Sequence, residues 1–484
     1  MRKVLLKFLV FSILCVGNVS CYRDSIVDGG ETGGDNTLVS FRLKLNLKEF
    51  ASTYHQIGKD PNATPIESTI NRMVVLHGRD DFDLTPLFFE KEDLEIKEGN
   101  LVAKKRLRIP SNHRIRVLSN VNDENVKSLR LTGSIKIDSI NNLGLTGTGE
   151  QITTPILMNG ELDLNSYNFN NWNNDSLVTI IQRRTLSKVL VKTSKKLDNN
   201  KIAIEGGEIS ELTVFLANMR RDLLSLLPKG SNHEYNTTFI RYPYEGIIIN
   251  NSNTNIKDDD AKVLYVTENL VSRQSTRNGN VTHFLIGTTF RPSKLATFQN
   301  GEIKLTDNVE KDLEEIKSSL FVVKVSATSD KVKDDGTLLY FRNQEQAKAY
   351  VESRKKEKIN LIIKEYHLSQ VFYHIYIKDS PVSPRFSIRS NVLYNITVTG
   401  IEGLGASIID IVKEDKSNGD GSGRWPWPIP PFPWPIPPFP WPWPPFPKPT
   451  PPDDGGGIII DDKNIKYEMN VEPWHINEQE SIAR

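Results

Sequence analysis

Cysteine is scarce in this chain. Among its 484 residues there are two, Cys15 and Cys21. Cys15 lies within the apolar segment 4–16, which follows a basic start and precedes a small residue, Ser20, next to Cys21. A charged start, a short apolar run and a small-residue junction are typical of a signal peptide, and the run is too short to span a bilayer in the mature protein. Cleavage before Cys21 leaves one thiol, which excludes an internal disulfide.

Other absences narrow the class of protein. With 61 Lys and Arg against 60 Asp and Glu, the chain lacks the basic excess that nucleic acid binding requires. After the signal segment there is no run of about 20 apolar residues. The eight histidines are scattered, and no phosphate-binding loop or nucleophile elbow occurs. The acidic run 258–260 lacks the oxygen spacing of a calcium loop, so we interpret it as a solvated loop, with calcium binding as the alternative. We therefore expect no enzyme, no metal, no cofactor and no nucleic acid partner.

The position of Cys21 suggests its modification. A lone cysteine at the end of a signal segment looks like a bacterial lipobox, in which the thiol receives diacylglycerol and the new amine an acyl chain. Burial of such chains is favourable by roughly 0.8 kcal/mol per CH2. We expect residues 1–21 to be a lipoprotein signal peptide, with lipid on Cys21 and an anchor in the outer membrane. The alternative is ordinary secretion with an incidental cysteine, since Asn18 fits the lipobox loosely.

Strand patterns dominate the body of the chain. Residues 39–47 alternate apolar and polar side chains without a break. Further strands are expected at residues 71–77, 107–109, 114–121, 128–137, 186–192, 212–216, 262–266, 283–291, 320–326, 359–364, 371–377 and 392–399. Many short strands with Gly, Asn and Asp between them favour an all-β protein of antiparallel sandwiches. Two short helices are expected at 308–319 and 344–356. The polar region 228–261 suggests a boundary, giving domains at 22–235 and 236–420.

A Pro- and Trp-rich linker is expected at residues 421–457. Its central part, 425–447, contains almost only Pro, Trp, Phe and Ile, and the segment 427–433 recurs at 434–440 and, altered, at 441–447. Proline fixes φ and removes donors, so the central part should form polyproline II at about 3.1 Å per residue, roughly 70 Å in all. It is either a spacer or a rod whose rings pack along a groove of the same or the next subunit, because free aromatic rings are a liability.

A last strand follows this linker, within residues 458–484. From residue 465 the alternation places Ile465, Tyr467, Met469 and Val471 on one face, and Trp474 follows. A strand separated from its domain by a long spacer has no neighbour of its own, and an isolated strand is not stable in water. It either folds back onto its own chain or adds to a sheet of another molecule.

Several segments, taken in order, resemble the fimbrillins, the type V pilins of Bacteroidales-type fimbriae, and most of all the minor-fimbria type of shaft subunit with a fimbrillin C-terminal domain. The similarity covers nearly the whole secreted chain. Its segments are 113–121 (HRIRVLSNV), 154–160 (TPILMNG), 182–189 (QRRTLSKV), 265–269 (YVTEN), 282–292 (THFLIGTTFRP), 389–401 (RSNVLYNITVTGI), 403–405 (GLG) and 471–479 (VEPWHINEQ).

The resemblance implies two transthyretin-like β-sandwich domains in a lipoprotein that becomes part of a cell-surface fimbria. In this family a protease removes the first strand, and the C-terminal strand of a neighbouring subunit fills the groove. The implied donor residues are Ile465, Tyr467, Met469, Val471 and Trp474. The implied partners are other fimbrial subunits, the outer membrane through the lipid, and host or bacterial surface ligands. The alternative is a surface lipoprotein adhesin of the same fold that does not polymerise.

The chain departs from the family at the excision site, which usually follows an arginine. No arginine lies between Arg42, in the first strand, and Arg72, in the second. Lys59 is the remaining basic candidate for proteolytic maturation. Cleavage there would make the protein a shaft subunit, whereas an uncut first strand would make it an anchor that keeps its lipid.

Overall fold

The computed structural model describes residues 38–46, 69–79, 84–97, 100–132, 155–164, 167, 176–194, 197, 201–220, 239–240, 247–248, 261–270, 281–308, 318–325, 338–355, 361–377, 386–408 and 464–473. The predicted signal peptide, Cys21, Lys59, the linker and Trp474 lie outside these residues, as does most of the helix predicted at 308–319.

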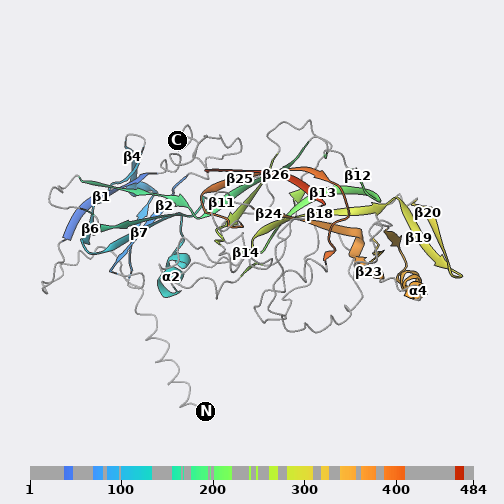
Figure 1. The fold of residues 1–484 in the computed structure, drawn as a ribbon. Helices are drawn as coiled ribbons and strands as arrows, with labels where there is room; N and C mark the ends of the chain where they lie inside the picture. Colours follow the sequence, from blue (N-terminus) through green and yellow to red (C-terminus); the bar gives the residue numbers. More distant parts are fainter. Residues whose placement is uncertain are drawn as a thin grey trace, which may run out of the picture.

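The protein is all-β, as the alternation predicted, and the described strands form two lobes that follow one another along an elongated molecule (Figure 1). Two sheets build the first lobe. One has the order β4 (Leu94–Lys97), β5 (Asn100–Ala103), β1 (Leu38–Asn46) and β6 (Leu107–Pro110), with β9 (Leu177–Ile181) also paired to β1. The other has the order β10 (Arg183–Arg184), β8 (Met158–Asp163), β7 (Arg114–Ser119), β2 (Arg72–Gly78) and β3 (Thr85–Glu90).

The core of the first lobe lies between these two sheets. Phe41 and Leu43 of β1 pack in one cluster with Val75 of β2 and Val117 of β7, and none of the four is exposed to solvent. The polar residues of β1 alternate with these and are partly exposed. The alternating sequence thus becomes a sandwich with one buried face per strand.

The second lobe repeats this arrangement with longer strands. One sheet has the order β17 (Lys262–Thr267), β11 (Leu186–Thr193), β25 (Val392–Ile401) and β26 (Ile465–Pro473). The other has the order β12 (Ile202–Ile204), β13 (Gly207–Ala217), β18 (His283–Pro292) and β24 (Gln370–Tyr376), with β16 (Ile247–Ile248) paired to β13. A two-stranded sheet of β14 (Met219–Arg220) and β15 (Phe239–Ile240) lies beside them. A single cluster of buried side chains from both large sheets forms the core.

A smaller unit is inserted between the paired strands β18 and β24. It contains the hairpin of β19 (Lys294–Gln299) and β20 (Glu302–Asp307), and a sheet of β22 (Leu339–Phe341), β21 (Leu320–Val325) and β23 (Leu361–Tyr366). The predicted second helix is confirmed as α4 (Gln344–Arg354), which covers a small apolar cluster of its own. The side chain of Asn343 caps it by accepting a hydrogen bond from the Gln346 backbone N–H at 3.0 Å.

The strand predicted at 128–137 is wrong over its described part, because residues Asp123–Thr132 form helix α2. Asn122 caps this helix, its side chain accepting a hydrogen bond from the Asn125 N–H at 2.7 Å, and Asp123 begins the acidic first turn. Val126 and Leu129 are buried at helical spacing. They pack in a cluster that contains side chains of both lobes, so α2 stabilises the junction between them.

Strands on either side of the boundary expected at residue 235 share sheets. β11 and β13 precede it, yet β11 pairs with β17 and β25, and β13 pairs with β18. The division into domains at this residue stays a prediction. Within the described ranges, no helix combines the length and the apolar character needed to cross a membrane.

Candidate functional site: the terminal strand and the first strand

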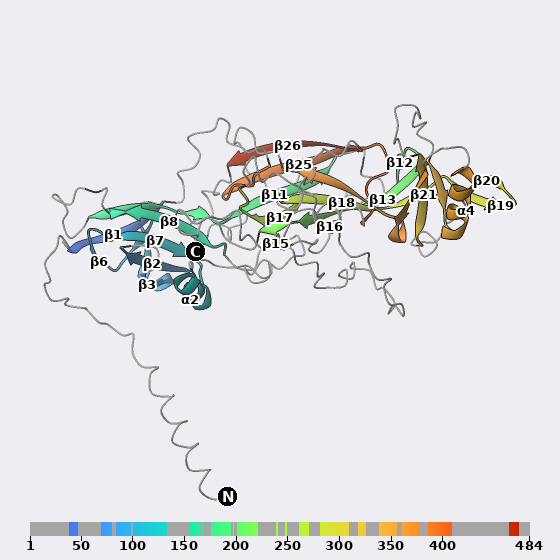
Figure 2. The ribbon, with the colours of Figure 1, turned by 60° about the horizontal axis from the view of Figure 1, so that its bottom comes forward.

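The terminal strand β26 lies at the edge of a sheet in the second lobe. It pairs antiparallel with β25 along its whole length, from Ile465 opposite Ile401 to Pro473 opposite Val392. Figure 2 shows β26, β25, β11 and β17 side by side in this order. Among the described strands β26 has no second neighbour, so it is an edge strand of this sheet.

Four apolar residues of β26 face the core of the second lobe. Ile465 is buried, and Tyr467, Met469 and Val471 are half-buried and pack against the same cluster. Lys466, Glu468 and Asn470 are exposed on the opposite face. The period of two therefore gives the strand one apolar face, as the sequence predicts. Four of the five predicted donor residues, Ile465, Tyr467, Met469 and Val471, lie on this face. Trp474 lies outside the described residues.

The start of β26 is fixed by contacts to the loop after β25. The Glu402 N–H donates to the Asn464 carbonyl at 2.9 Å, and the Asn464 side-chain amide donates to the Leu404 carbonyl at 3.0 Å. Lys466 forms an ion pair with Glu402. A side chain on Gly403 would come within 2.6 Å of the Asn464 side-chain oxygen. Gly403 therefore makes room for the Asn464 side chain, whereas Gly405 approaches β24, where a side chain would come within 2.4 Å of the Phe372 carbonyl.

Tyr467 connects the two sheets of the lobe. Its hydroxyl donates to the Tyr376 carbonyl on β24 at 3.2 Å. Nearby, the Tyr373 hydroxyl donates to the Gly403 carbonyl at 2.9 Å, so the same loop is held from the opposite sheet. These two bonds orient β26 across the sandwich as well as along its edge.

Sequence reasoning missed a polar network at the start of β25. Asn391, which has a positive φ of 59°, accepts hydrogen bonds from the backbone and side chain of Arg184 at 3.4 Å. The Ser390 N–H and hydroxyl donate to Glu268 at 3.3 and 3.4 Å. Burial raises the pKa of Glu268, while the bonds from Ser390 act in the opposite direction. All four residues, Arg184, Glu268, Ser390 and Asn391, belong to segments that carried the family resemblance, which was the available signal.

The first strand β1 occupies an interior position, in contrast to β26. Lys44 and Leu45 have partners on β5 and on β9 at the same time, so both edges of the strand are paired there. The β5 and β6 pairings are antiparallel and the β9 pairing is parallel. Four alternating apolar residues, Val39, Phe41, Leu43 and Leu45, are each between 0 and 6% exposed, whereas Leu38 at the start of the strand is 61% exposed. Removal of β1 would open the core of the first lobe between two strands.

Two histidines are buried beside the terminal strand's hydrogen-bond partner Tyr376. The ring centroids of His283 and His374 are 5.2 Å apart, and both rings contact that of Tyr376. Burial lowers the pKa of His283 to about 4, and burial together with His283 lowers that of His374 to about 3. Both imidazoles are therefore neutral at pH 7. Across the described residues, no group of three or more His, Cys, Asp and Glu is placed to hold a metal ion.

No family model matches the sequence, and no curated protein sequence matches it either. Similar solved structures exist. The tip fimbrial protein Mfa3 from Porphyromonas gingivalis, solved with a C-terminal truncation, is 9% identical with a TM-score of 0.35, over 75% of this chain and 96% of that one. A fimbrilin from Porphyromonas gingivalis W83 is 12% identical with a TM-score of 0.32, over 77% and 92% of the two chains.

A third solved structure, a fimbrial assembly protein from Parabacteroides distasonis ATCC 8503, is 12% identical with a TM-score of 0.27, over 57% of this chain and 100% of that one. The structural neighbours are thus Bacteroidales fimbrial proteins, at low identity and with low TM-scores.

Proposed function

We propose that this protein is a structural subunit of a cell-surface fimbria, exported as a lipoprotein and polymerised by donor-strand exchange. The observation that carries the proposal is β26: an edge strand with one apolar face, joined to the body through a long Pro-rich segment. Such a strand has the properties required for adding to a sheet of another copy, where main-chain hydrogen bonds give affinity and side-chain pockets give specificity.

The proposed acceptor is the position of β1. Four buried apolar side chains contribute roughly 1.5 to 3 kcal/mol each, and a domain is stable by only about 5 to 15 kcal/mol. The first lobe therefore requires a replacement strand as soon as β1 is removed. β26 offers four apolar residues with the same spacing, Ile465, Tyr467, Met469 and Val471, against Val39, Phe41, Leu43 and Leu45 in β1. Excision and insertion should accordingly be coupled.

A pair of substitutions tests the role of β26. Met469→Asp places a carboxylate on the apolar face and should abolish filaments while the monomer stays folded, because β26 is an edge strand. Asn470→Asp introduces the same side chain at the exposed neighbouring position and should leave filaments intact. Electron microscopy of sheared surface material is the measurement. Normal filaments from both variants, or from a chain lacking residues 465–484, would reject the proposal.

The alternative is a surface lipoprotein adhesin of the same fold that does not polymerise. One observation favours it: β26 pairs with β25 of its own chain, which a self-contained subunit would also do. The adhesin hypothesis predicts that ligand binding and surface display survive deletion of residues 465–484. The fimbrial hypothesis predicts that this deletion abolishes filaments.

Maturation is proposed at two positions. Cys21 carries lipid in the precursor, so Cys21→Ser should abolish incorporation of labelled palmitate, and equal labelling of the variant would contradict this.

Cleavage after Lys59 releases β1 and the lipid together and makes the protein a shaft subunit. Mass spectrometry of assembled filaments should then find a mature N-terminus between residues 48 and 69, displaced or lost in Lys59→Gln. An acylated Cys21 peptide in the filament would instead indicate an uncut anchor.

A further inference from the structure

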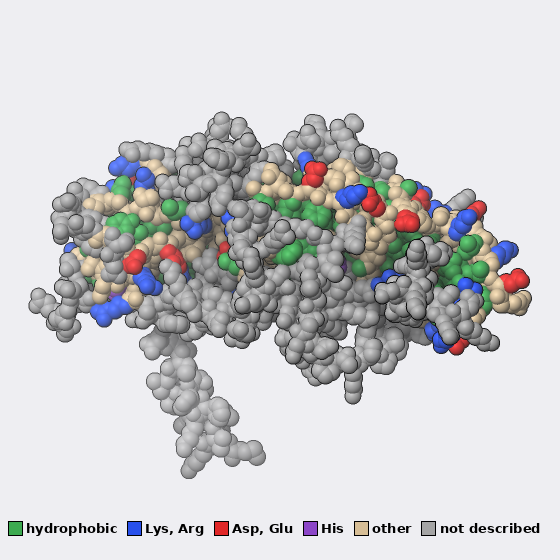
Figure 3. All heavy atoms as spheres, viewed as in Figure 1, with side chains coloured by type: hydrophobic (Ala, Val, Ile, Leu, Met, Phe, Trp, Pro, Cys, Tyr) green, Lys and Arg blue, Asp and Glu red, His purple; other side chains and the backbone are tan. Residues whose placement is uncertain are grey.

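Strand β20 presents an apolar edge at the end of the second lobe. All six of its residues are exposed, including Ile303 at 39% and Leu305 at 51%. Among the described strands it pairs only with β19. Figure 3 shows hydrophobic side chains among charged ones at this end of the molecule. An exposed edge with large apolar residues is a template for pairing with another chain.

These two side chains continue the small core under helix α4. Ile303 stands opposite Phe298 and Leu305 opposite Ala296 in the hairpin, so all four lie on one face. Ala296 is buried in the α4 cluster and Phe298 packs against it. The apolar face therefore runs from the core to the edge of β20 and ends there in solvent.

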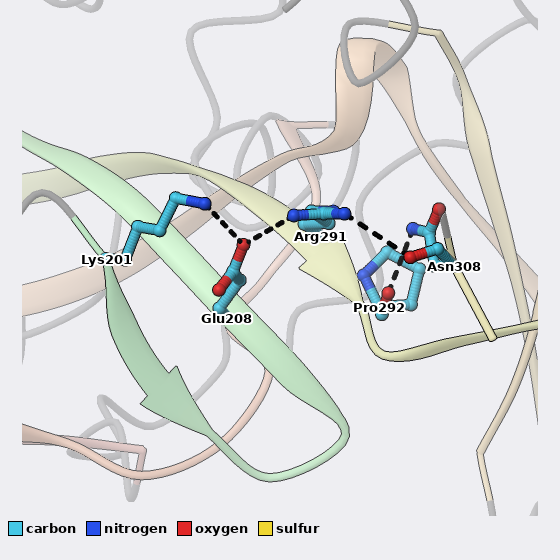
Figure 4. Close-up of polar contacts among 5 residues, drawn as sticks. All are labelled: Lys201, Glu208, Arg291, Pro292 and Asn308. Atoms are coloured by element: carbon cyan, nitrogen blue, oxygen red, sulfur yellow. Dashed lines mark hydrogen bonds and ion pairs between the residues drawn. The ribbon is translucent and has the colours of Figure 1, made fainter. Parts of the chain in front are cut away.

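The hairpin is fixed at its base. Arg291 on β18 pairs with Glu208 at 3.0 Å and donates to the Asn308 carbonyl at 3.3 Å, and Asn308 donates to the Pro292 carbonyl at 2.9 Å (Figure 4). Lys201 approaches the same carboxylate of Glu208 at 3.5 Å. Because these contacts hold the residues before β19 and after β20 to the sandwich, the edge of β20 has a defined direction.

A second edge strand with an apolar face lies in the opposite lobe (Figure 1). Strand β4 pairs with β5 alone among the described strands. Leu94 lies in the core of the first lobe, and Ile96, two residues later on the same face, is 49% exposed. Lys97 is exposed, and Glu95 is paired with Arg42 at 3.3 Å with 40% of its side chain exposed. Like β20, this edge carries an apolar face and a face with one acid and one base.

We propose that β20 of one copy pairs antiparallel with β4 of a second copy of this chain. The proposal rests on the proposed function, since it supplies an additional contact between subunits of the same assembly. The antiparallel register brings four matching pairs opposite one another: Glu302 with Lys97, Ile303 with Ile96, Lys304 with Glu95, and Leu305 with Leu94. Opposite charges and apolar pairs directly across an antiparallel ladder are stabilising, and like charges are destabilising.

Other pairings of these edges match less well. A parallel ladder with Ile303 opposite Ile96 puts Glu302 against Glu95 and Lys304 against Lys97, so like charges meet. A symmetric pair of two β20 strands centred on Ile303 puts Leu305 against Gly301, a turn residue with φ of 80° that cannot continue the ladder. The pairing of β20 with β4 is also open-ended: the copy that contributes β20 keeps its own β4, and the other copy keeps its own β20. A head-to-tail contact of this kind propagates along a filament.

A charge exchange tests this contact. In a Met469→Asp chain, where exchange of β26 does not contribute, sedimentation equilibrium should show association weakened about fivefold by Glu302→Lys or by Lys97→Glu, since each puts like charges opposite one another. The double variant restores opposite charges and should associate like the parent. Equal association of all four chains, or a double variant no stronger than the Glu302→Lys chain, would overturn the proposal. Symmetric β20 pairs would leave the Lys97→Glu chain as strong as the parent and the double variant as weak as Glu302→Lys.

Cross-linking separates this proposal from strand exchange. In a Cys21→Ser chain, oxidation of the pair Ile303→Cys and Ile96→Cys should produce a ladder of covalent multimers, because opposite residues in a ladder are within disulfide reach. The pair Lys294→Cys and Ile96→Cys, with an equally exposed thiol at the hairpin base, should produce none. Filaments without the ladder reject the β20–β4 contact and leave the proposed function standing. A ladder without filaments supports the contact and rejects strand exchange.

Discussion

The first strand and the last strand of the described chain carry the same pattern in opposite settings. β1 is paired on both edges around Lys44 and Leu45, and its four alternating apolar residues, Val39 to Leu45, are at most 6% exposed. β26 is paired on one edge, and three of its four apolar residues are half-buried. Alternation specifies which face of a strand is apolar, whereas its place in the sheet decides how strongly the strand is held. Judged by strand pairing and burial, β1 is a core strand of its lobe, whereas β26 is an edge strand that is held less strongly.

The largest expected effect is on β1. Leu43→Asp would bury a carboxylate among apolar side chains, which costs several kcal/mol and approaches the stability of a whole domain. We expect loss of soluble protein. Ser40→Asp, the same side chain on the partly exposed face of the same strand, should change the free energy of unfolding by about 1 kcal/mol or less. Soluble yield and denaturant unfolding are the measurements, and equal behaviour of the two variants would break the comparison.

A truncation to alanine in each strand should give a smaller contrast. Phe41→Ala leaves a cavity in the first core and should destabilise by about 3 to 5 kcal/mol. Tyr467→Ala removes a half-buried side chain and its hydrogen bond to Tyr376, which amounts to about 2 kcal/mol. Denaturant unfolding with a probe in each lobe would resolve the two effects. If Tyr467→Ala lowers the free energy of unfolding as much as Phe41→Ala does, β26 contributes to its core as strongly as β1.

The pH dependence should reveal the buried histidines of the β26 lobe. The pKa values of His283 and His374 are lowered from 6.5 to about 4 and about 3, so the unfolded state binds more protons below pH 6.5. Stability is fully present above pH 6.5 and should fall on acidification towards pH 4 by about 1.4 kcal/mol per pH unit for each group. Thermal unfolding of the double variant His283→Asn, His374→Gln should show a shallower slope, to which His77, whose pKa burial also lowers to about 4, still contributes. An unchanged slope would show that groups other than His283 and His374 cause the loss of stability at low pH.

Much of the fold was predictable where one signal dominated. The alternation in residues 39–47 predicted β1 and its buried face, and residues 465–471 predicted β26 in the same way. Residues 128–137 were wrongly predicted as a strand because Leu129 and Leu131 also fit a period of two. The decisive helix signal, the Asn122 cap with an acidic first turn, lies upstream of this segment. Short strands such as β4, β12 and β20 went unpredicted, since a few residues carry too little periodicity to be recognised.

The sequence by itself determined the strand-rich class, the apolar face of each long strand and the separation of β26 from the body by a Pro-rich segment, because these follow from side-chain periodicity and from the fixed φ of proline. Tertiary structure alone decided which strands become neighbours. β1 is enclosed by β5 and β9, and β11 pairs with β25, about 200 residues later in the chain (Lys188 opposite Leu393). β4 and β20 are edge strands among the described ones. All of these features depend on contacts between distant segments. Periodicity specifies a face, but pairing is a property of two strands, and no single segment encodes its partner.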